Sequence, residues 1–207
     1  MNKLSELSLP IKLIMLAGAI HLIYLVQINR LFWYMQIMYH PIVIFSAELF
    51  ASVLLAIAMF AGLKVKLKIS PFQKKWLLSL VIGLVAIIAL YFLSKWTGFY
   101  FYSEADSSVW RPYFIMETFL FMPLLQELTF RELFLKLFPT KLAWMYILGS
   151  SLAVLTFSFI FLGSYDIKLL IFLFFSGLVF SGLRWYSKDI KLPIVLHILL
   201  NLGAYFL

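Results

Sequence analysis

Two pairs of polar residues in an otherwise apolar chain are spaced to share helix faces. Glu127 and Arg131 are four residues apart, as are His197 and Asn201, so each pair is predicted to lie on one face of a helix. Carboxylate and imidazole groups can accept a proton, and imidazole and amide groups can donate hydrogen bonds to a carbonyl or an oxyanion. The spacing therefore predicts a polar chamber between two helices. Its groups serve either as a site or as interhelical bonds that fix the packing.

The helices that carry these pairs are predicted from composition. Hydrophobic residues make up 64% of the 207 residues and charged residues 13%, and the mean hydropathy is +1.02. A membrane-spanning helix needs about 20 mostly apolar residues. Such stretches predict an all-α, polytopic membrane helix bundle with about seven transmembrane helices. They run roughly over 11–27, 41–63, 76–94, 113–134, 141–163, 167–186 and 192–207.

The organisation of the chain is predicted to be simple. No internal repeat or low-complexity linker is found, so we expect a single membrane domain over 1–207. The segment Arg30–His40 is aromatic and ends before Pro41, and it is either an interfacial helix at the outer surface or a continuation of the first span. Glu132 is near the end of its span, where we expect a charge at headgroup level.

Basic residues divide unevenly between the two sides of the predicted bundle. A cytoplasmic N-terminus places twelve of them inside and four outside, which is the distribution of the positive-inside rule. The net charge of +8 is thus explained by topology with membrane lipid as the neighbour, and nucleic acid is not expected as a partner. The inside set is Lys3, Lys12, Lys64, Lys66, Lys68, Lys74, Lys75, Lys136, Lys141, Arg184, Lys188 and Lys191, and the outside set is Arg30, Lys95, Arg111 and Lys168.

Two further patterns concern helix packing. Small residues allow close approach of membrane helices, so the fifth and sixth predicted spans are expected to pack tightly. The small residues are Gly149, Ser150 and Ser151 on one span and Gly177 and Ser181 on the next. The sixth span is also rich in phenylalanine, and we expect these side chains to face lipid or a partner membrane protein. They are Phe172, Phe174, Phe175 and Phe180.

The motif spacing resembles that of a known family. Residues 126–134, Gln-Glu-Leu-Thr-Phe-Arg-Glu-Leu-Phe, resemble the E-E-x-x-x-R motif of the CAAX-protease and bacteriocin-processing family (CPBP, or Abi) of intramembrane proteases. His197 and Asn201 are similar to its last motif, H-x-x-x-N, and Phe157–Phe161 stands where its middle motif, F-x-x-x-H, is expected. The resemblance implies a CPBP-like core over 113–207, preceded by N-terminal spans and an outer loop over 1–112.

Two positions depart from the family pattern. The resemblance implies that in active members the first glutamate and the middle histidine activate the attacking water, while the last histidine and asparagine stabilise the oxyanion or hold the substrate carbonyl. Gln126 and Phe161 stand at the two water-activating positions. Neither an amide nor a phenyl ring can accept the proton. Histidine occurs only at positions 21, 40 and 197, so no shifted register supplies the missing imidazole.

The chain also offers few groups for a metal. Cysteine is absent, and zinc sites normally use three protein ligands. Glu127 and His197 are the two plausible ligands that remain at the predicted site. We therefore expect no cofactor, and a metal ion enters only if the protein is a divergent protease.

These observations leave three functional hypotheses. The first is a catalytically impaired pseudoprotease of the bacterial cell membrane that binds or scaffolds a membrane peptide or protein, as in bacteriocin immunity or regulation of a membrane complex. The second is a divergent intramembrane endopeptidase that uses Glu127 and His197, and the third is a small transporter subunit. The sequence leaves open whether the protein is an enzyme.

Overall fold

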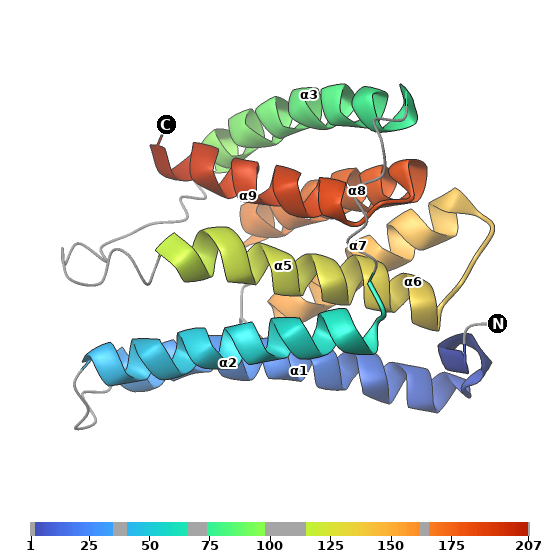
Figure 1. The fold of residues 1–207 in the computed structure, drawn as a ribbon. Coiled ribbons are helices and arrows are strands. Elements are labelled where there is room, and N and C mark those ends of the chain that lie inside the picture. The colour runs from blue at the N-terminus through green and yellow to red at the C-terminus, as the bar shows by residue number, and fades with distance from the viewer. Residues whose placement is uncertain (1–2, 35–40, 66–73, 98–114, 162–165, 207) are drawn as a thin grey trace.

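The computed structural model describes residues 3–34, 41–65, 74–97, 115–161 and 166–206, and these residues form a bundle of helices (Figure 1). No strand occurs within these ranges. The predicted all-α helix bundle is therefore confirmed.

The N-terminal helices follow the predicted spans. A short 3₁₀-helix, η1 (Lys3–Glu6), precedes α1 (Leu9–Tyr34), α2 (Pro41–Gly62) and α3 (Lys74–Thr97). Proline at the first position of α2 suits a helix start, because its missing N–H would have no partner there. The aromatic segment that follows the first span continues α1 as far as Tyr34, and residues 35–40 lie outside the described residues.

The C-terminal half begins with one continuous helical run of changing pitch. This run consists of η2 (Glu117–Phe121), α5 (Met122–Glu127), η3 (Leu128–Leu133) and α6 (Phe134–Leu137). It is followed by α7 (Ala143–Phe161), α8 (Ile167–Ser187) and α9 (Lys191–Phe206). Asp166 caps α8 by accepting a hydrogen bond from the Lys168 N–H at 2.9 Å.

Two of the described helical segments are long and apolar enough to cross a membrane. They are Trp76–Trp96 in α3 and Ile167–Ser187 in α8. Shorter apolar segments occur in α1, α2, α7 and α9. The outward faces of these six helices carry large apolar side chains, which are suited to contact with lipid tails. The cytoplasmic orientation of the N-terminus stays a prediction.

The motif-bearing run from η2 to α6 occupies the centre of the bundle. Figure 1 shows α5 and α6 between α1 and α2 on one side and α8 and α9 on the other, and contacts join the run to α1, α2, α7, α8 and α9. Every residue from Glu127 to Leu133 is buried. A helix enclosed on all sides can carry charged groups only where other helices supply partners.

The α7–α8 pair packs as the small residues predict. A Cβ atom added at Gly177 would lie 3.2 Å from the Cα atom of Ser151, so the two backbones are as close as glycine permits. Nearby, the Ser181 hydroxyl donates to the Ser150 hydroxyl at 2.9 Å. The expectation of close approach between these two helices is confirmed.

The expectation that the phenylalanines of α8 face lipid is wrong for two of them. Phe172 and Phe180 are only 2% and 1% exposed, whereas Phe175 is 48% exposed. Phe172, Ser176 and Phe180 recur every four residues, so they share the face of α8 that is turned into the bundle. Phe175 lies about 100° around the helix from Ser176, outside this face. Hydropathy alone does not separate these two faces, because both environments are apolar.

Candidate functional site

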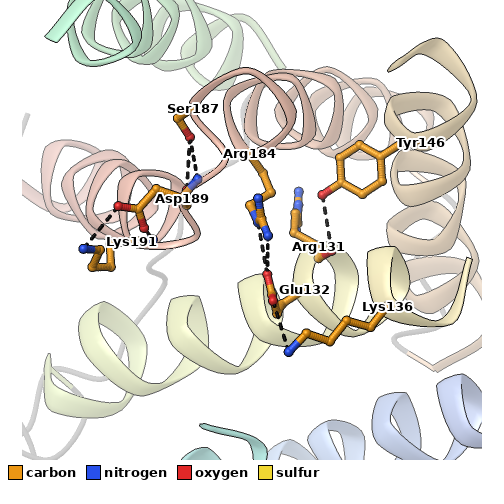
Figure 2. Close-up of polar contacts among 8 residues, drawn as sticks. All are labelled: Arg131, Glu132, Lys136, Tyr146, Arg184, Ser187, Asp189 and Lys191. Carbon is orange, nitrogen blue, oxygen red and sulfur yellow. Dashed lines mark hydrogen bonds and ion pairs between the residues drawn. The ribbon is translucent and has the colours of Figure 1, made fainter. Parts of the chain in front are cut away.

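The helix that carries Glu127 and Arg131 widens into a π-helical turn over η3. At its end, the N–H of Phe134 bonds to the carbonyl of Thr129, five residues earlier, as well as to that of Arg131. Two hydroxyls of α7 bond to carbonyls of this turn: Ser150 donates to Phe130, and Tyr146 donates to Arg131 at 3.3 Å (Figure 2). Such turns are frequent at functional sites, and here side chains of a neighbouring helix stabilise it.

Glu127 is the centre of the polar cluster. Its carboxylate is fully buried, and its Oε1 atom lies 3.3 Å from Arg131 Nη1 and 2.8 Å from His197 Nδ1. An ionised carboxylate only accepts hydrogen bonds, so His197 donates through a protonated Nδ1. The remaining ring nitrogen, Nε2, is therefore the one through which His197 can bind a further group. Spacing within one helix predicted the first contact, and packing between α5 and α9 creates the second.

Phe180 of α8 completes this cluster. Its ring stacks on the imidazole of His197, with centroids 4.9 Å apart and planes 16° apart. The guanidinium carbon of Arg131 lies 5.7 Å from the centre of the same ring. Both contacts are of the kind that aromatic faces make with planar and cationic groups. No sequence motif indicated that α8 contributes to the site.

The other predicted site residues lie on α5, α7 and α9. Asn201 is buried on α9, four residues beyond His197, and Gln126 is half-buried next to Glu127. The side chain of Phe161, at the end of α7, lies outside the described residues. The structure thus brings together Glu127, Arg131 and His197.

A second ionic cluster adjoins the first. Glu132 Oε2 accepts two hydrogen bonds from Arg184, from Nε at 3.1 Å and from Nη2 at 2.7 Å, and Lys136 Nζ lies 3.3 Å from Glu132 Oε1 (Figure 2). Glu132 is 7% exposed and Arg184 is 9% exposed. Glu132 and Arg184 are therefore paired inside the bundle, and the headgroup-level position of Glu132 stays a prediction. Their ion pair joins η3 to α8.

Sequence reasoning missed this pair for a simple reason. Arg184 lies in the last turn of α8, shortly before Lys188 and Asp189, so it has the appearance of a flanking charge. Its partner is 52 residues earlier in the chain, and spacing within one helix gives no signal for such a contact. A second acidic residue directly after Arg131 was the available hint, because a buried carboxylate needs a cation.

The comparison with protein families agrees with this geometry. Residues 108–203 match the family described as Type II CAAX prenyl endopeptidase Rce1-like. This segment of the chain is thus similar to the CPBP/CAAX protease family. The matched segment contains the central helical run, α7, α8 and both residues of the last motif. No curated protein and no solved structure matches the chain.

The apolar helices and the similarity to this family indicate a membrane protein. The chemistry open to its site follows from the contacts. Oε1 of Glu127 contacts both Arg131 and His197, and its other oxygen, Oε2, has no hydrogen bond among the described residues. Glu127 and His197 bond to each other, and no group of three histidine and acidic side chains near enough to hold a metal ion is found within the described ranges.

Proposed function

We propose that this CPBP protein is catalytically impaired and acts by binding a peptide or protein partner within the membrane. The observation that carries the proposal is the state of Glu127, which is fully buried and shared between Arg131 and His197. This carboxylate is therefore already engaged by two side chains of the bundle. Gln126, in the place of the first glutamate of the motif, cannot replace it.

The groups that remain are suited to binding. With Nδ1–H committed to Glu127, Nε2 of His197 can accept a hydrogen bond, and the amide of Asn201, one turn further along α9, can donate one. A peptide backbone, whose N–H donates and whose carbonyl accepts, is the ligand expected for these two side chains. Immunity to a bacteriocin, or regulation of a membrane complex in a bacterial cell membrane, is the biological setting that we propose for this activity.

The catalytic half of the proposal is tested by peptide cleavage. We expect the purified protein in lipid bilayers to leave a broad panel of peptides uncut. Restoring both family residues, Gln126→Glu with Phe161→His, tests whether water activation is what was lost, and cleavage that appears in this variant but not in the single variants supports the proposal. Cleavage by the unaltered protein that disappears in Glu127→Ala contradicts it.

The binding half is tested by capture of partners from native membranes in stoichiometric amounts. The captured partner is then purified and titrated against the protein in bilayers. We expect His197→Ala to weaken its binding about 2- to 13-fold, because one hydrogen bond contributes about 0.5–1.5 kcal/mol. His21→Ala is the matched control, since His21 is exposed on α1. Unchanged affinity in His197→Ala would reduce the polar cluster to a packing role.

One observation favours a second function, a divergent intramembrane endopeptidase. The 2.8 Å bond from His197 Nδ1 to Glu127 resembles the carboxylate–histidine pairs in which the carboxylate orients an imidazole base. In that mechanism Nε2 of His197 takes the proton from water. Glu127→Gln should then reduce cleavage by a factor on the order of 10⁴, as the loss of an orienting carboxylate does elsewhere. The absence of turnover in the unaltered protein counts against this alternative.

A further inference from the structure

Helix α8 contacts the motif-bearing run through three neighbouring side chains. Phe180 stacks against His197, Ser181 bonds to Ser150, and Arg184 bonds to Glu132. The first and last of these are four residues apart and therefore lie on one face of α8. None of the three belongs to the motifs that relate this chain to the CPBP family. Helix α8 thus forms a wall of the site that the motifs do not describe.

The contact of Phe180 with His197 restricts the imidazole in a specific way. The hydrogen bond to Glu127 fixes where Nδ1 points, but it leaves the ring able to tilt about that bond. A phenyl ring 4.9 Å away and inclined by 16° opposes this tilt, because the imidazole would collide with its face. Phe180 is 1% exposed, so its own position is fixed by packing. The two contacts together determine the direction of Nε2.

The position of Phe180 is in turn fixed by the polar contacts of α8. Arg184 bonds to one oxygen of Glu132 through two nitrogens, which holds α8 both along and around its axis. Ser181 adds a bond through Ser150, which itself bonds to the carbonyl of Phe130 in the π-helical turn. A shift of α8 relative to η3 would break these bonds. The ring of Phe180 is therefore held in register with His197.

We propose that Phe180 is a positioning residue for His197, holding the Nδ1–H toward Glu127 and aiming Nε2 at the bound partner. The part that concerns the partner rests on the proposed function, and its ligand group is a peptide N–H, which donates to Nε2. The part that concerns the orientation and tautomer of His197 is independent of any partner. It holds equally if the protein binds a peptide or cleaves one.

A packing role alone would make different predictions, and the chain offers a matched control. Phe172 lies two turns before Phe180 on the same buried face of α8 and is 2% exposed. Methionine fills a volume similar to that of phenylalanine but has no ring plane. Phe172→Met and Phe180→Met therefore disturb packing alike, and only the second removes the aromatic face from His197.

The test measures the tautomer of His197 directly. The full chain, with ¹⁵N-labelled histidine, is studied by NMR in lipid bilayers without a partner, and the signals lost in His197→Gln identify His197 among the three histidines. We expect a single Nδ1–H tautomer in the unaltered protein, in Phe172→Met and in Phe180→Tyr, which keeps the ring. In Phe180→Met we expect the Nε2–H form to appear beside it, or the signals to broaden through exchange.

Two results overturn the proposal. One is a Phe180→Met protein whose His197 signals equal those of the unaltered protein or of Phe172→Met. The other is a folded Phe180→Tyr protein that has lost the Nδ1–H signal, and this test remains available if Phe180→Met does not fold. A failure of the proposed function is distinguishable, because it appears as peptide cleavage or absent binding while the tautomer is unchanged.

Discussion

The ion pair between Glu132 and Arg184 allows a quantitative test of how the site is held together. Arg184→Met removes the guanidinium but keeps most of the apolar stem, so the main change is the loss of two hydrogen bonds of 3.1 and 2.7 Å. Removing one partner of a buried ion pair typically costs about 3–5 kcal/mol, because the other charge is left without compensation. Glu132 keeps Lys136 at 3.3 Å, and the Lys136 side chain is 23% exposed. We therefore expect a loss near the lower limit, about 3 kcal/mol.

The same reasoning predicts that removing both charges is much less costly. In Glu132→Met with Arg184→Met no buried charge is left unpaired, and replacement of a buried pair by apolar residues is often neutral or stabilising. The double variant should lie within about 1 kcal/mol of the unaltered protein, since the site is well packed. The double variant should thus be more stable than Arg184→Met by about 2–4 kcal/mol.

The assay is equilibrium unfolding of the purified chain in mixed micelles, with tryptophan fluorescence as the signal. Lys191→Met is the matched control, because it also replaces a cation by methionine, at the start of α9. Its partner Asp189 is 3.2 Å away, and the two side chains are 25% and 19% exposed, so we expect a loss below about 1 kcal/mol. The reasoning is refuted if Arg184→Met costs no more than Lys191→Met, or if the double variant is as unstable as Arg184→Met.

Two further predictions concern the helices around the motif. Gly177→Ala should destabilise the protein by about 1–3 kcal/mol, because the new methyl group would lie 3.1–3.2 Å from Ser151, including its backbone. Gly182→Ala is its control: the nearest atom is 3.9 Å away, so stability should be unchanged or rise by up to about 1 kcal/mol. Tyr146→Phe should cost about 1 kcal/mol through loss of the 3.3 Å bond to the Arg131 carbonyl. Equal unfolding midpoints for the two glycine variants, or no effect of Tyr146→Phe, would contradict these assignments.

The positions of the helices were largely predictable because the signals for them are local. The predicted second span began at Pro41, where α2 begins, and the predicted sixth span began at Ile167, where α8 begins. Proline, an acidic cap and the length of an apolar stretch all act within a few residues. The predicted contact of Glu127 with Arg131 is of the same kind, since one helix brings the two side chains together.

The wall formed by α8 was not predictable in the same way. In a soluble protein, inward and outward faces differ in polarity, but lipid tails are as apolar as the interior of a bundle. Phe175 and Phe180 are therefore indistinguishable by hydropathy, although one is 48% exposed and the other 1%. Likewise, Arg184 has the sequence context of a flanking charge, because its partner Glu132 on η3 is 52 residues away in the chain. Burial of charge inside a membrane protein is decided by tertiary packing.

The charge balance of the site bears on what it can bind. Glu127 is paired with Arg131, and Glu132 is paired with Arg184, so each buried carboxylate has its own guanidinium. A charged ligand group entering this region would leave one charge uncompensated in an apolar environment, which costs several kcal/mol. An uncharged group disturbs neither pair. Because Nδ1–H of His197 is committed to Glu127, its Nε2 accepts a hydrogen bond and is suited to an uncharged donor. This is the physical reason for assigning a peptide N–H, and no charged terminus or side chain, as the group that His197 binds in the proposed binding function.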